Sequence, residues 1–313
     1  MLAYTARRLL LTLPVMLVVA FFVFSLLNLT PGDPVILLAG EDATAQDIAR
    51  IRASLSLDQP FFFRFAQWLW RVVQGDLGES IFTGLSVSHM IGQHLTPTIT
   101  LMLMTLVSSM LIAIPLGALA AWFRNGAFDR LVVMLTVVSF SIPSFVIGYL
   151  IAWIVGIKFG LLPVQGYIPF SEGFWASLRT LILPTVALCS AYVALITRIT
   201  RATLLETLTQ DYIRTARAKG VSDETVLFRH ALKNVAVPVI TVIGSGVALL
   251  IGGAVITETV FSIPGIGRLT VDAILRRDYP IIQGVILMFS FMYVLVNLGV
   301  DLLYRIFDPR IKY

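Results

Sequence analysis

Charged residues are scarce in this sequence. Asp, Glu, Lys and Arg together make up 13% of its 313 residues, whereas hydrophobic residues make up 58%. Soluble globular domains carry about 25% charged residues, which cover the surface that faces water. The composition therefore excludes a water-soluble fold and indicates an integral membrane protein.

Cysteine, histidine and one common nucleotide-binding motif are rare or missing. Cys189 is the only cysteine, so no disulfide can form within one chain, and we expect it to pack as a small apolar side chain. The three histidines, His89, His94 and His230, fall on opposite predicted sides of the membrane, which disfavours a shared metal site. The motif G-x-x-x-x-G-K-[ST], which binds nucleotide phosphates, does not occur.

These absences predict a chain that is not an enzyme. We expect it to have no catalytic residue, no bound cofactor and no bound metal. Any ATP, with its Mg²⁺, would be used by partner subunits. The apolar stretches also lack charged residues at their centres, whereas proton relays and ion pathways usually require such groups.

Six uncharged stretches are long enough to cross a membrane. About 20 apolar residues cross the hydrocarbon core, and a charged residue at the centre of a span costs about 2.5–3.5 kcal/mol. The predicted spans are 9–32, 97–123, 131–157, 180–197, 234–257 and 279–300. The sequence thus predicts an all-α integral membrane protein with six transmembrane helices. The first span is longer than the apolar region of a signal peptide and is expected to be an uncleaved anchor.

Lys and Arg are distributed unevenly around these spans. If the N-terminus is cytoplasmic, fourteen of them fall on the inner side and five in the two short outer loops. Positive residues close to spans favour the cytoplasm, and long segments are largely exempt from this rule. We therefore predict that both termini are cytoplasmic. The net charge of +5 then reflects topology and not nucleic-acid binding.

The longest predicted external segment, 31–96, follows an N-terminal tip and first helix at 1–30. Its stretch 61–73 combines six aromatic residues with Arg64 and Arg71. Aromatic side chains favour the membrane interface, where an apolar ring meets a wet edge. Two interpretations stay open: a helix on the outer leaflet or against its own bundle, and a docking surface for a soluble binding protein.

Polar and helix-breaking residues inside the spans suggest where a pathway could run. Most of the polar residues are expected to form hydrogen bonds between helices. The candidates to line a translocation pathway are Ser141, Ser144, Ser245 and Asn297. Prolines and glycines in the spans are expected to serve bundle packing or, alternatively, to shape a cavity.

Residues 198–235 form a charged island between the fourth and fifth spans. A helical run is predicted to end at Lys219, because Gly220 tolerates the left-handed conformation of a helix C-cap. Ser222 is a favourable N-cap for a second helix, and Asp223 places negative charge on its first turn. The pattern predicts a helix, turn, helix elbow with a basic tip that contacts another protein. Helix-compatible sequence joins this elbow to both flanking spans.

Several segments resemble one transporter family. The run DYIRTARAKGVS followed by HALKNV is similar to the cytoplasmic coupling loop, or EAA loop, of importer-type ABC transporter permeases. Segments along the whole chain resemble the first permease subunit of bacterial dipeptide, oligopeptide and nickel importers: RRLLLTLPV, LTPGDP, SLDQP, FSIPGIGR, RRDYP and VDLLYRIFDPRIKY. Arg214 and Thr215 depart from the general loop pattern, which has Glu and Ala there, whereas Ala216 and Gly220 fit it.

This resemblance implies a type I ABC importer permease fold with its core at 97–305, a long external loop between helices 1 and 2, and a cytoplasmic tail at 306–313. It implies a multi-pass protein of the bacterial inner membrane that transports di- or oligopeptides. The implied partners are a homologous second permease, two ABC ATPase subunits, an external solute-binding protein and the lipid bilayer, with no nucleic acid. The residues implied to couple to an ATPase are Arg214, Thr215, Ala216, Arg217, Ala218, Lys219, Gly220, Val221, Ser222 and Asp223.

Other functions stay open at this point. Similar permeases serve importers of nickel or metallophore chelates and of glutathione. A secondary transporter that works alone is less favoured, because it predicts charged residues inside the spans or an inverted repeat. A structural scaffold would leave the basic elbow without an explanation.

Overall fold

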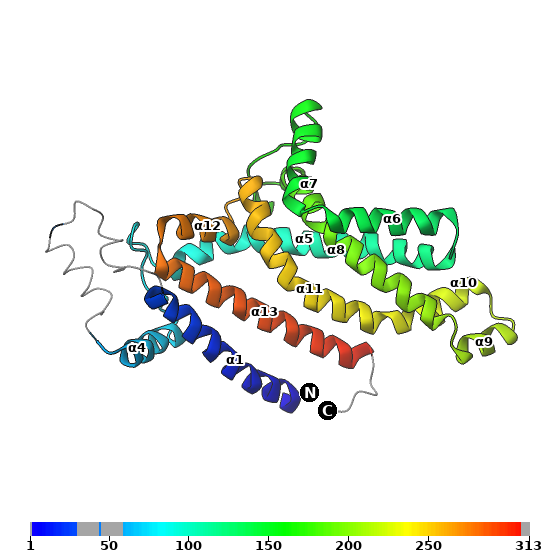
Figure 1. Cartoon of the computed structure of the whole chain (residues 1–313), viewed down its shortest axis with the longest axis horizontal. Helices are drawn as coiled ribbons and strands as arrows, with labels where there is room; N and C mark the ends of the chain where they lie inside the picture. The colour runs from blue at the N-terminus through cyan, green and yellow to red at the C-terminus, as the bar shows by residue number, and fades with distance from the viewer. Residues whose placement is uncertain (1, 30–43, 45–58, 308–313) are drawn as a thin grey trace. The chain divides into compact units, whose positions relative to one another are not determined.

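Helices make up the regular structure of the chain wherever the computed structural model describes it, which is at residues 2–29, 44 and 59–307 (Figure 1). One isolated β-bridge joins Glu79 and Ser86. The chain divides into two units, one of Met1–Leu95 with Leu269–Val294, and one of Thr96–Arg268 with Leu295–Tyr313. Most of the predicted external segment before residue 59 and most of the predicted C-terminal tail lie outside the described residues, and the predicted domain boundaries stay predictions.

The first unit is built around a small aromatic core. Its helices are α1 (Leu2–Leu29), α4 (Phe61–Val73), the beginning of α5 (Val87–Trp122), most of α12 (Ile266–Arg276) and the beginning of α13 (Tyr279–Phe307). Phe24 of α1, Trp68 of α4 and Leu287 of α13 are buried together. The hydroxyl of Ser80 donates a hydrogen bond of 2.5 Å to the buried carboxylate of Asp278, which ties the start of α13 to the loop before α5.

The second unit is organised around α8. Its helices are the rest of α5 and α13, α6 (Ala127–Ser141), α7 (Ser144–Ile151), η1 (Ala152–Lys158), η2 (Phe170–Glu172), α8 (Phe174–Thr207), α9 (Asp211–Ala218), α10 (Asp223–Thr225), η3 (Val226–Ala231) and α11 (Leu232–Val260), and it includes the first residues of α12. Helix α8 packs against α6, α7 and α11. Its apolar stretch of 18 residues is 67% buried, whereas the corresponding stretches of the other spanning helices are 28–39% buried. Helix α8 is therefore the central helix, and the other spanning helices expose more of their apolar side chains.

The predicted spans coincide with helices. Four helices are long and apolar enough to cross a membrane: Val87–Trp122, Phe174–Thr207, Asp223–Val260 and Tyr279–Tyr304. The pair Ala127–Ser141 and Ser144–Lys158 makes a fifth if it is counted as one span, and the first predicted span corresponds to the shorter apolar helix Leu10–Leu26. The all-α membrane class is confirmed, with four to five crossings by length and composition among the described residues.

The third predicted span, 131–157, is not a straight helix. It is bent by 99° at the break between α6 and α7. Pro143 explains the break, since proline lacks the backbone donor that a helix needs and pushes the preceding residue out of the helical region. Ile142 is accordingly extended, with φ −95° and ψ 123°. The second half of this span ends in the wider turns of η1.

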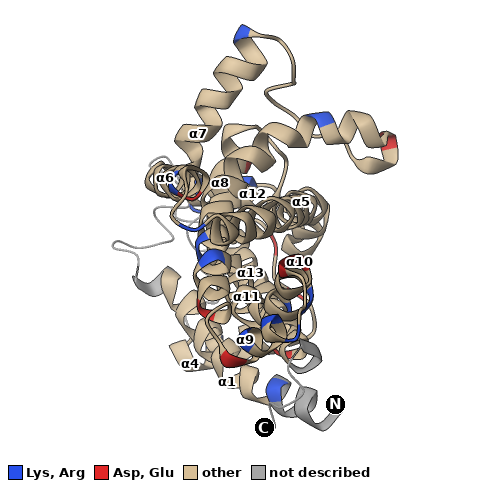
Figure 2. Cartoon of the chain, turned by 90° about the vertical axis from the view of Figure 1, so that its right-hand side faces the viewer, with Lys and Arg blue, Asp and Glu red and all other residues tan. Residues whose placement is uncertain are grey.

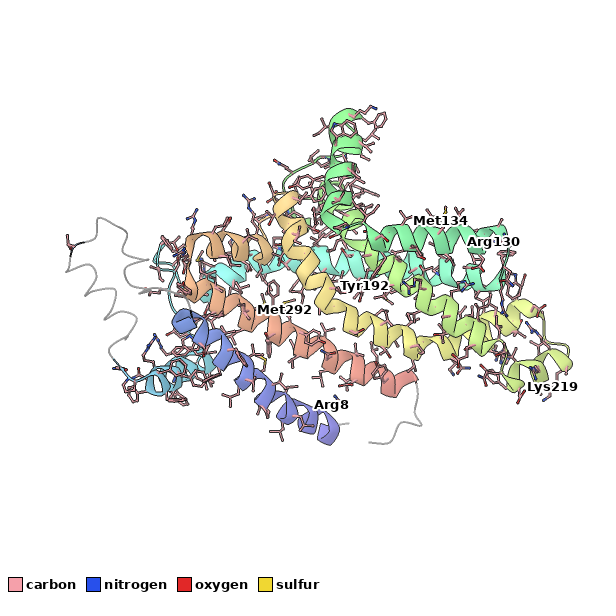
Figure 3. All side chains as sticks on the ribbon, viewed as in Figure 1. Arg8, Arg130, Met134, Tyr192, Lys219 and Met292 are labelled. Atoms are coloured by element: carbon pink, nitrogen blue, oxygen red, sulfur yellow. The ribbon has the colours of Figure 1, made fainter. Side chains whose placement is uncertain are left out.

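Small residues allow α8 and α11 to pack closely. A Cβ atom at Gly246 would overlap the ring of Tyr192, and one at Gly253 would meet Leu188 at 2.5 Å. The Tyr192 hydroxyl, whose residue is labelled in Figure 3, donates a hydrogen bond to the backbone carbonyl of Ile243. The predicted role of glycine in helix contacts is thus realised at this interface.

Candidate functional site

The predicted elbow turns at Gly220. Gly220 has φ +79°, the left-handed region that glycine adopts at little cost. Its N–H donates to the carbonyl of Arg217 at 2.9 Å, and the N–H of Val221 donates to that of Ala216 at 3.2 Å. This pair of bonds is a Schellman motif, which satisfies the last carbonyls of α9 and reverses the chain direction. The predicted helix end is confirmed, with α9 ending at Ala218.

The second arm begins where it was predicted, although without the predicted cap bond. Ser222 occupies the N-cap position of α10, but its hydroxyl bonds the hydroxyl of Thr225 at 2.9 Å and no backbone N–H. Asp223 lies in the first turn, and its carboxylate accepts a hydrogen bond of 3.0 Å from Nε of Arg217. This ion pair bridges the two arms of the elbow.

Buried apolar side chains anchor the elbow at the end opposite its tip. Ile213 of α9 is fully buried, as are Val226 and Ala231 of η3. The Asn234 side chain at the start of α11 donates to the hydroxyl of Tyr212 at 2.6 Å. The two arms are therefore fastened to each other at their base as well as at the turn, which favours movement of the elbow as one rigid piece.

The tip of the elbow is exposed and charged. Of the ten residues predicted to couple to an ATPase, eight are exposed, and the remaining two, Ala216 and Val221, are partly buried. Figure 2 shows basic and acidic residues together on α9 and α10, whereas α5 is mostly without charge. Lys219, labelled in Figure 3, lies between α9 and α10. Phe228 of η3, just after the second arm, is 70% exposed. The sequence did not predict this exposure, because Phe228 follows the apolar residues Val226 and Leu227, which are buried.

The elbow is continuous with only one of its two flanking spans, which corrects the expectation of helix on both sides. Helix α8 ends at Thr207, and three residues separate it from α9. Gln210 is extended, with φ −68° and ψ 151°, so the helical path is interrupted. On the other side, the helix from Asp223 to Val260 runs without a break. A rigid connection therefore leads from the elbow to α11.

The candidate pathway residues lie on four different helices. Ser141 and Ser144 stand on either side of the break between α6 and α7, Ser245 lies in α11 and Asn297 in α13. The hydroxyls of Ser141 and Ser245 donate to carbonyls of their own helices, at 2.8 and 3.2 Å. Ser141 and Ser245 are exposed, whereas Ser144 and Asn297 are partly buried. Their role in a pathway stays a prediction.

Two of the three histidines, His89 and His94, form hydrogen bonds within their own helix. The ring of His89 bonds the Gln93 side chain at 2.9 Å, and the ring of His94 bonds the carbonyl of Met90 at 2.7 Å. Over the described residues, no group of three His, Cys, Asp or Glu side chains could hold a metal ion. That the chain binds no metal or cofactor stays a prediction.

A buried carboxylate that the sequence pattern did not predict lies at the far end of α11. Glu258 is 0% exposed. It accepts hydrogen bonds from the Thr98 hydroxyl at 2.6 Å, from the N–H of Arg268 at 3.1 Å and from the N–H of Gly267. The Thr98 oxygen in turn accepts the N–H of Ile266 at 2.8 Å. Glu258 and Thr98 thus cap the first turn of α12, where the helix dipole favours negative charge.

The glycines of the segment FSIPGIGR make room for this carboxylate. A Cβ atom at Gly265 or Gly267 would collide with the Glu258 carboxylate. Glu258 lies one residue beyond the uncharged stretch 234–257, and its position at the end of a predicted span does not indicate that it is buried. The signal was present in the glycines that follow, since glycine allows close approach to its backbone.

An ion pair with a buried carboxylate holds α6 against α8. Asp129 is 3% exposed, and its carboxylate accepts hydrogen bonds of 2.5 and 2.8 Å from Nε and Nη2 of Arg201. It also accepts the N–H of Asn125 at 2.9 Å. This two-point contact is the strong geometry of an Arg and carboxylate pair, and it fixes the helix that leads down to the elbow.

Comparison with known proteins identifies the family. The family model described as "Binding-protein-dependent transport system inner membrane component" matches residues 113–313, and the model of the N-terminal part of such membrane components matches residues 1–109. This chain belongs to the inner-membrane permeases of binding-protein-dependent transport systems. The resemblance seen in the sequence is confirmed, and the permease is a multi-pass subunit of an ABC importer.

Relatives match the permease over its full length. It is 49% identical over 310 residues to the probable peptide ABC transporter permease protein y4tP of Sinorhizobium fredii, with 99% of each chain covered. It is 40% identical over 313 residues to the glutathione transport system permease protein GsiC of Salmonella typhimurium, and 39% identical over 333 residues to the dipeptide transport system permease protein DppB of Alkalihalophilus pseudofirmus, each with 100% of both chains covered.

Proposed function

We propose that this permease is the first of two permease subunits in an ATP-driven importer of di- or oligopeptides. The full-length identity of 49% to a relative named as a peptide ABC transporter permease carries this proposal, and the relative named as a dipeptide permease supports it. The relative named as a glutathione permease favours glutathione as a second candidate. Nickel or metallophore chelates are the remaining alternative.

In the proposed assembly, a homologous second permease forms the other half of the pathway, and two ATPase subunits bind ATP and Mg²⁺ and carry out hydrolysis. An external solute-binding protein delivers the substrate. The chain itself is not an enzyme, binds no cofactor or nucleic acid, and keeps both termini in the cytoplasm. The distribution of Lys and Arg around the spans supports this orientation.

The elbow is proposed to transmit motion from an ATPase subunit to the spans. Its turn is closed by a Schellman motif at Gly220, its arms are joined by the pair Arg217 and Asp223, and its base is fixed by buried Ile213. These features support a rigid, exposed tip that a partner subunit can bind. Movement of the tip would reach α11 directly, because the helix is unbroken from Asp223 to Val260.

Reconstitution tests the substrate class. The permease, a homologous second permease and two ATPases are placed in liposomes with the binding protein, and ATP-dependent uptake is measured for a dipeptide, an oligopeptide, glutathione and a nickel chelate. Uptake of the peptides above the other two supports the proposal. Uptake without any ATPase subunit, or uptake of the nickel chelate alone, would contradict it.

Topology has its own test. A single cysteine is introduced by Lys219→Cys in a Cys189→Ala background. In right-side-out vesicles, a membrane-impermeant maleimide should label it only after the vesicles are opened. Labelling of intact vesicles would place the elbow outside and end the coupling proposal.

A further inference from the structure

Helix α4 has three faces that differ in exposure. One face packs on α1 and contains the buried residues Arg64 and Trp68 with the partly buried residues Phe61, Phe65, Leu69 and Val72. A second face is exposed although it is apolar: Phe62, Phe63, Trp70 and Val73 are 74%, 53%, 65% and 72% exposed. The third face is polar, exposed and narrow, with Gln67 and Arg71.

The exposed apolar residues form one continuous stripe. At 3.6 residues per turn, positions 62, 63, 66, 70 and 73 fall within an arc of about 100°. Four large apolar side chains in such an arc on a 13-residue helix are a patch that water does not favour and that marks an interaction surface. A single exposed aromatic residue would not require this explanation.

This stripe continues the apolar surface of α1. Helix α1 exposes Leu13, Val18 and Phe22, as expected for a helix that faces lipid in an inner-membrane protein. Phe21, also exposed, packs edge-on against Phe61, with 5.8 Å between ring centroids, and Phe61 packs edge-on against Phe62 of the stripe, with 5.4 Å between centroids. The outward surface of α4 is therefore joined to a lipid-facing surface, which favours lipid as its occupant.

The charges of α4 fit the same occupant. The helix contains two arginines and no acidic residue. Arg64 lies in the buried face, with its guanidinium carbon 5.7 Å from the centroid of the Phe24 ring. Arg71 is exposed on the polar face, beside the apolar stripe. Aromatic rings at the boundary of headgroups and acyl chains, with a basic residue among the phosphates, are typical of an interfacial helix.

We propose that the stripe of Phe62, Phe63, Trp70 and Val73 inserts into the boundary between lipid headgroups and acyl chains, with Arg71 facing the phosphates. Under the topology of the proposed function, on which this point rests, the leaflet is the outer one. Because the opposite face packs on α1, the helix would anchor the first span to the membrane surface.

Spin labels test this placement in the assembled transporter. In a Cys189→Ala background, Phe62→Cys and Val73→Cys place a label on the stripe, and Gln67→Cys is the matched control on the polar face of the same helix. The transporter is reconstituted in liposomes, and collision of each label with oxygen, which dissolves in lipid, is compared with collision with a water-soluble nickel chelate. The ratio of oxygen to nickel accessibility should be severalfold higher at positions 62 and 73 than at 67.

Three results would overturn the proposal. Equal ratios at all three positions would place the stripe in water, and shielding of positions 62 and 73 from both reagents would place them against protein. Loss of their oxygen accessibility on addition of the binding protein would make the stripe a docking surface.

A separate measurement tests which leaflet the helix contacts. The nickel chelate, added only outside right-side-out vesicles, should reach position 67. If it reaches that label only from inside, the topology of the proposed function fails while lipid contact stands.

Discussion

The two ends of the helix that runs from Asp223 through α11 are built on opposite principles. At one end, the elbow is exposed to water, and its charged residues Arg217 and Asp223 form an ion pair on the surface. At the other end, Glu258 is fully buried and holds backbone donors of the next helix. Charge in this chain therefore has two uses: at the elbow it is available to a partner, and at the buried end it fixes geometry.

The energetic consequences should differ as well. An exposed ion pair contributes about 0–1 kcal/mol to stability. Hydrogen bonds to a buried charged group contribute about 1.5–3 kcal/mol each, and leaving their donors without a partner is costly. Changes at Glu258 should therefore act mainly on stability, whereas changes at the elbow should act mainly on coupling.

The largest effect on stability is expected for Glu258→Gln. The amide keeps the shape of the side chain, and its oxygen can still accept from the N–H groups of Gly267 and Arg268. Its NH₂ group then replaces the carboxylate oxygen that accepts the Thr98 hydroxyl, and that hydrogen bond is lost. We expect a loss of about 2–3 kcal/mol, measured as a lower melting temperature of the purified permease in detergent. The matched control is Glu172→Gln, because Glu172 is exposed. An unchanged melting temperature for Glu258→Gln would remove the distinction between the two ends.

A smaller effect on stability, with a large effect on transport, is expected for Gly220→Val. A Cβ atom at Gly220 meets no neighbour within 4 Å, so the cost is the left-handed backbone, about 1–2 kcal/mol. The distorted turn should abolish uptake and substrate-stimulated ATPase activity while the protein still inserts.

Gly160→Val is the matched control for this change. Gly160 has φ +63° and equally open surroundings, but it lies in the loop between η1 and η2. Its strain is the same in kind, and uptake should persist. Gly220→Asn should also keep activity, since Asn tolerates this conformation. If Gly220→Val keeps both uptake and stimulated ATPase activity, the coupling role of the turn is wrong.

The smallest effect on stability is expected for Arg217→Asp, below about 1 kcal/mol, because both partners of its ion pair are largely exposed. The single change should weaken coupling, measured as uptake per ATP hydrolysed. The exchange Arg217→Asp with Asp223→Arg should restore part of it if the pair acts by bracing the two arms. A double variant as impaired as the single one would show that Arg217 acts by contacting the partner directly.

Prediction from sequence succeeded where the determinant was local. The end of α9 at Gly220 was predictable because a left-handed cap depends on the residue itself. The expectation of a continuous helix between the elbow and α8 was wrong, because nothing in the types of residue at 208–210 predicts an extended Gln210. The hydroxyl of Ser222 bonds the side chain of Thr225 and not a backbone N–H group. Which of these neighbouring groups bonds the hydroxyl cannot be predicted from residue types alone.

The membrane class, the positions of the apolar spans and the place of the elbow follow from the sequence alone, because these features depend on hydrophobicity along the chain and on the conformational limits of single residues. Two further features became visible with the packing of the helices: Thr98 and Glu258, 160 positions apart, share a hydrogen bond, and α4 leaves one apolar face uncovered. Burial of a carboxylate and exposure of a phenylalanine both depend on which helices pack together, and long-range packing is absent from any local pattern.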